Sequence, residues 1–154
     1  MTTLRTLTAG VAAGAAVLLL VASVAAGADA DSDSAAPGDP LTQAVARGQT
    51  LFSLETFGGN GNTCETCHSG GGKLPGMLPD GRQLPSLINA AAIFPRFSRG
   101  AGAVVTLEGQ VRQCIRGGLG GSPPPAGSPD LVALTAYLGS IALGQAVDIG
   151  GAPK

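Results

Sequence analysis

The chain has 154 residues and a formal net charge of -1, and only 12% of its residues are charged. This balance gives no indication of a nucleic-acid partner. There is no Trp, one Tyr and four Phe, so aromatic side chains can fill little of a core. The 25 glycines and 11 prolines favour tight turns and long loops over regular structure.

The first thirty residues predict a secretory signal peptide. Arg5 precedes an apolar stretch from Ala9 to Ala26, and small residues follow, ending in Ala28-Asp29-Ala30. The alternative is an uncleaved membrane anchor, because the stretch is nearly long enough to span a bilayer. We expect an exported, periplasmic protein that contacts a membrane only if residues 1–30 are retained, with residues 31–38 as a flexible tether.

A first helix is predicted to begin at Asp39-Pro40. Asp39 can cap free backbone N–H groups, and proline is tolerated in the first turn because its missing N–H costs nothing there. An apolar stripe with helical spacing follows, formed by Leu41, Ala44, Val45, Gly48, Leu51 and Phe52. We expect this stripe to face inward.

The run Cys64-Glu65-Thr66-Cys67-His68 is the most specific motif of the chain. Two thiols three positions apart can each form a thioether with a haem vinyl group, and the adjacent imidazole then binds the iron as proximal ligand. The alternatives are a redox CxxC or half of a zinc site, but a zinc ribbon needs a second ligand pair. The motif therefore predicts one covalent haem c, with its iron, in a c-type cytochrome.

Two further helices are expected after a long, irregular segment. Between His68 and Thr106 the pattern predicts only a short helix after Ser86, which ends before Pro95. A bound haem would organise so long a run without regular structure. The next helix is predicted from about Thr106 to Arg116, with Leu107, Val111, Cys114 and Ile115 on its buried face. The last begins at Ser128-Pro129, and its apolar face carries Leu131, Leu134, Tyr137, Leu138 and Ile141.

The sixth position of the haem iron has two sulfur candidates. His68 is the only histidine, so a second histidine ligand cannot come from this chain. Met77 follows His68 so closely that a short loop would have to reach around the haem edge, whereas ample chain separates His68 from Cys114. Cys114 is therefore the favoured distal ligand and Met77 the runner-up, with an open or otherwise ligated site as a third alternative.

The first and last helices resemble those of the class I cytochrome c fold, in which they cross through a glycine and an aromatic residue. Gly48 and Phe52 on the first helix match this pattern, as do Leu134 and Tyr137 on the last. The resemblance implies an all-α, cytochrome c-like domain at residues 39–147, with a third helix and long loops wrapped round the haem. Residues 148–154 are then a tail.

Three stretches resemble the haem domain shared by the A subunit of the Sox sulfur-oxidising complex and by thiosulfate dehydrogenases. They are residues 87–97 (LINAAAIFPRF), 105–108 (VTLE) and 111–114 (VRQC), within a likeness that covers residues 41–146. In that family the cysteine that corresponds to Cys114 is the distal haem ligand and lies where the sulfur substrate is handled. Catalytic members typically have a second haem domain or a partner haem, whereas this chain carries one CxxCH motif.

These features favour an electron carrier between a donor and an acceptor redox protein, in the oxidation of sulfur compounds. The first alternative is an enzyme subunit that oxidises or conjugates thiosulfate with Cys114 at the haem, and the second is a haem-based sensor. Basic side chains gather in one part of the sequence: Lys73, Arg82, Arg96, Arg99, Arg112 and Arg116. They are expected to pair with the haem propionates, to bind thiosulfate or another small sulfur anion, or to receive an acidic partner.

Overall fold

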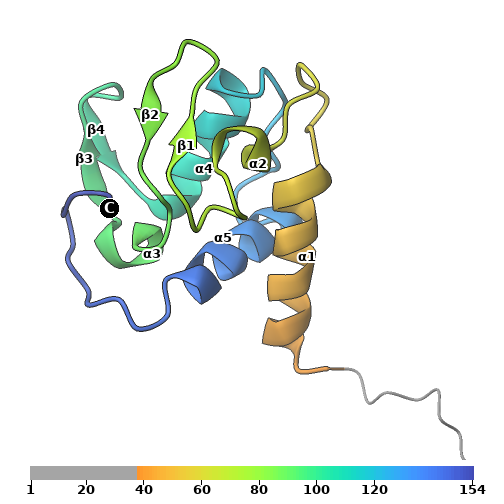
Figure 1. Cartoon of the computed structure of the whole chain (residues 1–154). Coiled ribbons are helices and arrows are strands. Elements are labelled where there is room, and N and C mark those ends of the chain that lie inside the picture. Colours follow the sequence, from red (N-terminus) through yellow and green to blue (C-terminus); the bar gives the residue numbers. More distant parts are fainter. Residues whose placement is uncertain (1–37) are drawn as a thin grey trace, which may run out of the picture. The chain divides into compact units, whose positions relative to one another are not determined.

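The computed structural model describes residues 38–154, so the predictions for residues 1–37 lie outside it. The described part is mostly helical, as expected, and Figure 1 shows its elements. The helices are α1 (Pro40–Leu54), α2 (Cys64–Cys67), α3 (Ala90–Ile93), α4 (Leu107–Gly117) and α5 (Pro129–Ile141). The strands are β1 (Gly76–Met77), β2 (Gln83–Leu84), β3 (Arg96–Ser98) and β4 (Ala103–Val105). No helix between residues 38 and 154 combines the length and apolarity that crossing a membrane requires.

The three longer helices begin where the sequence predicted, each with a side-chain cap. The Asp39 carboxylate accepts from the backbone N–H of Thr42 at 3.1 Å. The Thr106 hydroxyl accepts from Gly109 N–H at 3.0 Å at the start of α4. At the start of α5, the Ser128 hydroxyl accepts from the backbone N–H of Leu131. These caps satisfy backbone donors that have no partner inside the helix.

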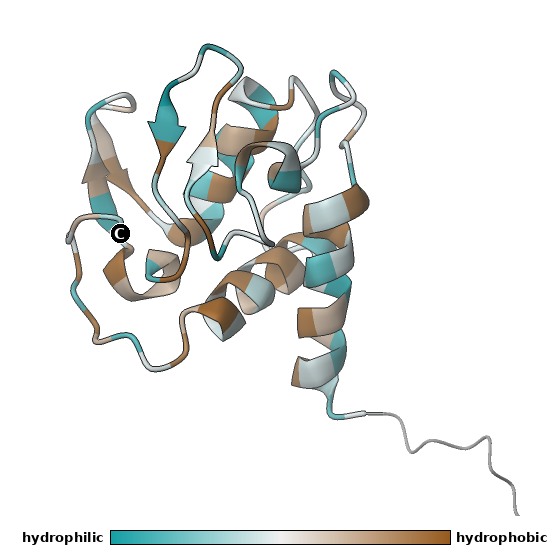
Figure 2. Ribbon diagram, in the orientation of Figure 1, coloured by the Kyte–Doolittle hydropathy of each residue, from teal (hydrophilic) through white to brown (hydrophobic). Residues whose placement is uncertain are grey.

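The apolar stripe of α1 is buried over only part of its length. Gly48 and Phe52 are buried, whereas the Leu41 side chain is 64% exposed, so the expectation that the whole stripe faces inward is wrong at its start. The reason is geometric, since the first turn of α1 extends beyond α5 in Figure 1. Figure 2 shows apolar and polar residues alternating along α1, while α5 is largely apolar.

Two small hairpins occupy the segment between the haem motif and α4, where the sequence predicted no strands. In the first, Gly76 pairs with Leu84 and the strands are antiparallel. In the second, Arg96 pairs with Val105, again antiparallel. Strands of two or three residues are too short to show a period-two pattern, which explains why the sequence did not reveal them.

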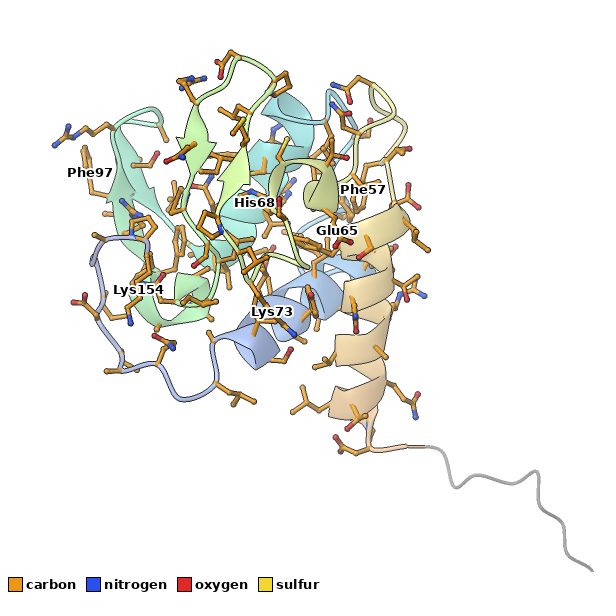
Figure 3. All side chains as sticks on the ribbon, in the orientation of Figure 1. Phe57, Glu65, His68, Lys73, Phe97 and Lys154 are labelled. Atoms are coloured by element: carbon orange, nitrogen blue, oxygen red, sulfur yellow. The ribbon has the colours of Figure 1, made fainter. Side chains whose placement is uncertain are left out.

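Residues 148–154 return to pack against α3. The Asp148 N–H donates to Ala92 O and the Gly150 N–H to Ile93 O, both at 2.9 Å. The buried Asn89 amide then donates to Ala152 O at 2.9 Å. Figure 3 shows Lys154 on the side of the fold that carries Phe97 and away from Glu65. The segment predicted as a tail is therefore hydrogen-bonded to the body of the domain.

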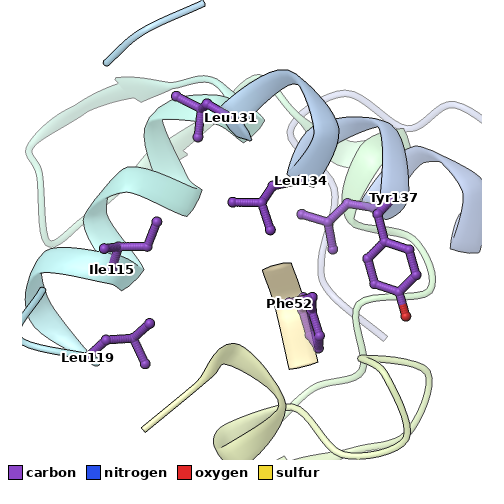
Figure 4. Close-up of a cluster of buried hydrophobic side chains, with 7 residues drawn as sticks. Phe52, Ile115, Leu119, Leu131, Leu134 and Tyr137 are labelled. Carbon is purple, nitrogen blue, oxygen red and sulfur yellow. The ribbon is translucent and has the colours of Figure 1, made fainter. Parts of the chain in front are cut away.

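Helices α1 and α5 cross at Gly48 and Tyr137, as the sequence predicted. A Cβ added at Gly48 would lie 2.8 Å from the Tyr137 Cβ and would overlap the backbone of Ala133. The rings of Phe52 and Tyr137 pack beside this point, with centroids 5.4 Å apart. The buried cluster around the crossing comprises Phe52, Ile115, Leu119, Leu131, Leu134, Tyr137 and Leu138 (Figure 4). This core holds α4 and α5 together and supports the haem motif.

Candidate haem site

The CxxCH motif forms a single helical turn that brings its chemical groups together. The backbone N–H of Thr63 donates to the Thr66 hydroxyl at 3.0 Å, which closes the start of α2. The His68 N–H donates to Cys64 O at 3.0 Å, so the imidazole follows directly on the turn that holds both thiols. Figure 3 places His68 near the centre of the fold.

A cavity of about 370 Å³ opens beside this turn and collects the predicted haem residues. Cys64, Cys67, His68 and Cys114 all line it. Its walls are mainly apolar and include Leu78, Leu84, Leu87, Ala90, Ile93, Phe94 and Leu119. Met77 is not among the lining residues, and its side chain is 56% exposed on β1. The structure therefore brings Cys114 to the cavity of the haem motif and leaves Met77 outside this cavity.

The His68 imidazole has the properties of an iron ligand. Burial lowers the pKa of His68 below its ordinary value, which favours the neutral ring with a free lone pair. Its Nδ1 atom is buried and makes no hydrogen bond within residues 38–154. The Phe52 ring from α1 lies nearby, with its centroid 6.4 Å from that of the imidazole. Phe52 therefore connects the crossing of α1 and α5 to the haem site.

The Cys64 thiol is held in its neutral form. Burial, with a smaller contribution from the neighbouring Cys114, raises the pKa of Cys64 to about 12. Cys64 and Cys114 both line the haem cavity.

Cys114 lines the cavity, and the expectation that it sits on the buried face of its helix is wrong. Ile115 is fully buried in the core, whereas Cys114 is exposed. Adjacent residues of a helix lie about 100° apart around its axis, so packing Ile115 against α5 turns Cys114 toward the cavity. The Gln110 side-chain amide donates to the Cys114 sulfur at 3.4 Å.

A hydrogen-bonded link that the sequence did not reveal joins α5 to the haem motif. The Tyr137 hydroxyl donates to Gly71 O at 2.8 Å, and the Gly71 N–H donates to a Glu65 carboxylate oxygen at 3.0 Å. Glu65 lies between the two cysteines of the motif and is labelled in Figure 3. The link connects the loop after His68 to the crossing helix.

The predicted basic residues take different roles. Arg82 is exposed and pairs with Asp80 at 2.8 Å. The backbone N–H of Arg82, together with its guanidinium group, holds the pKa of Asp80 below its ordinary value. Arg96 is half-buried and lines the haem cavity. Arg96 also lines a second cavity of about 530 Å³, with Phe97, Ser98, Arg99 and Gln110. Because two of its five lining residues are arginines, we call this second space the cationic cavity.

Residues 47–147 match the family model described as SoxA/TsdA, cytochrome c domain. The chain belongs to this family. It is 28% identical over 119 residues to a thiosulfate dehydrogenase of Allochromatium vinosum, a match that covers 74% of this chain and 42% of the relative. It is 30% identical over 122 residues to a thiosulfate dehydrogenase of Thiomonas intermedia, which covers 75% of this chain and 36% of the relative. The chain thus spans less than half the length of these relatives.

Solved structures give the same fold. A thiosulfate dehydrogenase (TsdBA) from Marichromatium purpuratum superposes with a TM-score of 0.60 at 23% identity, over 77% of this chain and 26% of that chain. SoxXA from P. pantotrophus superposes with a TM-score of 0.56 at 22% identity, over 72% of this chain and 37% of that chain. The cytochrome c-like fold that the resemblance implied is confirmed.

A cytochrome c domain carries covalently bound haem c, and the residues of the cavity fit this group. Two thiols and a neutral imidazole with an unpaired buried nitrogen stand at one end of it. Apolar walls suit the porphyrin face, and Arg96 offers a cation for a carboxylate. The volume lies within the range of small-molecule sites, about 300–1,000 Å³.

Proposed function

We propose that the chain is an exported c-type cytochrome with one haem c, which passes electrons from a donor to an acceptor redox protein during the oxidation of sulfur compounds. Cys64 and Cys67 hold the haem as thioethers, and His68 is the proximal ligand. The single observation that carries the proposal is the cavity, because it gathers these three residues and Cys114 in one apolar space.

Cys114 is the proposed distal ligand, in preference to Met77. The sulfur of Cys114 faces the cavity that His68 also lines, whereas Met77 stands on an exposed strand outside it. A thiolate ligand lowers the reduction potential relative to a thioether, because it stabilises the more positive iron. It also explains an odd thiol in an exported protein, since bonding to iron protects it from stray pairing.

The residues of the chain have separate tasks in this role. When bound, the haem supplies the one-electron chemistry. Leu84, Leu87 and Ile93 exclude water from the cavity, and this burial contributes to the reduction potential. The α1 and α5 crossing holds the loop of His68 through Phe52 and Tyr137.

The proposed domain organisation places a signal peptide at residues 1–30, a tether at 31–38, the cytochrome domain at 39–147 and a tail at 148–154. Export follows from the signal and from the chemistry, because haem attachment then occurs outside the cytoplasm. The mature protein is periplasmic, or anchored to the membrane if the first segment is retained. No role with nucleic acid is proposed.

The second candidate is an enzyme subunit that oxidises or conjugates thiosulfate with Cys114 as the sulfur-handling group. The cationic cavity favours it, because Arg96 and Arg99 could bind a sulfur oxyanion beside Gln110, whose amide contacts the Cys114 sulfur. The relatives matched are named thiosulfate dehydrogenases, which points to the same substrate class.

Two measurements test these proposals. The intact mass of the secreted protein should exceed that of the polypeptide by one haem, and Cys64→Ala with Cys67→Ala should abolish the increase. The oxidised protein is then mixed with thiosulfate alone. The carrier predicts no reduction until a donor redox protein is added, whereas direct reduction by thiosulfate supports the enzyme. A secreted protein with the mass of the bare polypeptide contradicts both proposals.

A further inference from the structure

Gln110 stands where the haem cavity and the cationic cavity meet. It lines both spaces, and its Nε2 atom donates to the sulfur of Cys114 at 3.4 Å. The residue is half-buried. This is the only hydrogen bond to the Cys114 sulfur within the described residues 38–154.

The backbone of α4 maintains this contact. Gln110 and Cys114 are one turn apart on a helix that Thr106 caps and that runs from Leu107 to Gly117. Helical side chains lean toward the N-terminus, so the Cys114 sulfur lies over the turn that carries Gln110. The amide therefore needs no rearrangement of the backbone to reach the sulfur.

A donor aimed at a sulfur ligand changes the electronic properties of the metal it binds. The hydrogen bond draws charge from the sulfur, which weakens its donation to the iron and favours the reduced state. It also fixes the direction of the sulfur lone pairs. Loss of the donor should lower the reduction potential and leave the sulfur free to rotate.

We propose that Gln110 is a positioning residue for Cys114, which holds the sulfur toward the haem and raises the reduction potential of the site. The proposal rests on the proposed function, because it requires Cys114 to be the distal ligand. It adds a residue that acts through the ligand and contacts no iron itself.

The test compares three variants of the full haem-loaded protein. Gln110→Leu keeps the approximate size and removes the donor, and Gln110→Glu replaces the amide with a carboxylate that repels the sulfur. Gln113→Leu is the matched control, because Gln113 lies on the same helix and lines neither cavity. Each protein is measured by redox titration and by electron paramagnetic resonance of the oxidised state, with circular dichroism to check the fold.

The expected result is a lower reduction potential and shifted low-spin resonances in Gln110→Leu, with a larger fall in Gln110→Glu and no change in Gln113→Leu. If either Gln110 variant folds and matches the wild type while Cys114→Ala changes the resonances, the inference is wrong and the ligation stands. If Cys114→Ala also leaves them unchanged, the proposed ligation fails, and this inference fails with it.

Discussion

The hydroxyl of Tyr137 donates a hydrogen bond of 2.8 Å to the carbonyl oxygen of Gly71, three residues after His68. The same Tyr137 packs on α1 at Gly48, so one side chain joins the helix crossing to the haem motif. The Gly71 N–H continues the link to Glu65. A change in the packing of the helix crossing should therefore alter the position of the loop after His68.

Substitution Tyr137→Phe tests this link. The ring and its packing remain, but the carbonyl of Gly71 loses its donor in a partly buried place. The free energy of unfolding should fall by about 1–3 kcal/mol, and a urea titration of the haem-loaded protein measures it. Ser140→Ala on the same helix is the control, because among residues 38–154 the Ser140 hydroxyl bonds only within α5. Equal stability of Tyr137→Phe and the wild type would show that the link contributes nothing.

Tyr137 should titrate above the ordinary range. Burial, and to a lesser extent the negative charge of Glu65, raises the pKa of Tyr137. The folded state then holds the phenol proton more tightly than the unfolded state, so this stabilisation is present below pH 10 and is lost as the pH rises through the folded pKa. Because Tyr137 is the only tyrosine, carbon NMR of labelled tyrosine follows it directly. Glu65→Gln should lower the measured pKa, and an unperturbed value in the wild type would contradict the prediction.

The helices of this fold could be predicted from the sequence because their signals are local. Asp39 and Ser128 act as caps next to prolines, and these positions set where α1 and α5 begin. Gly48 inside a helix costs about 1 kcal/mol, so its presence indicated a close contact, and Tyr137 provides it. Periodicity and turn chemistry were sufficient for these elements.

The walls of the site could not be predicted in the same way. The hairpins of β1 to β4 and the return of residues 148–154 to α3 depend on contacts between distant segments. Helical periodicity placed Cys114 with Ile115 on one face, but it could not decide which of these neighbours enters the core. Nor does a five-residue motif indicate that Glu65 binds the backbone of Gly71.

A methyl group at Gly48 should disrupt the helix crossing. Gly48→Ala places a Cβ against Ala133 and Tyr137, which forces α1 and α5 apart. We expect a loss of about 1–3 kcal/mol in the free energy of unfolding, despite the better helix propensity of alanine. Gly139→Ala on α5 is the matched control, because a Cβ there meets no atom within 4 Å. This control should be stabilised by about 0.5–1 kcal/mol. Chemical denaturation should therefore show changes of opposite sign in the free energy of unfolding of the two variants. A stabilised Gly48→Ala would contradict the close contact at the crossing.

Residues 148–154 should detach when Asn89 is shortened. Its side-chain amide donates to Ala152 O, its side-chain oxygen accepts from Lys154 N–H, and it makes no cap to α3. The side-chain hydrogen bonds that Asn89→Ala removes within residues 38–154 are therefore those to this segment. Hydrogen exchange of the Asp148 and Gly150 amides should accelerate, because their bonds to α3 open with the segment. Gln83→Ala, on an exposed position of β2, should leave both rates unchanged. Unaltered exchange in Asn89→Ala would mean that the segment is held by other contacts.

The distal ligand of the haem iron should be Cys114, because its sulfur faces the cavity. Cys114→Ala is expected to replace the low-spin thiolate spectrum of the oxidised protein with a high-spin or newly ligated form and to raise the reduction potential. Met77→Ala is the matched control, because Met77 is exposed on β1 and lines no part of the haem cavity, and its spectrum should equal that of the wild type. Electron paramagnetic resonance separates thiolate from thioether ligation in both variants. A spectrum that changes with Met77 and is unaffected by Cys114 would reverse the assignment, and the β1 and β2 hairpin would then have to move over the haem to bring the thioether to the iron.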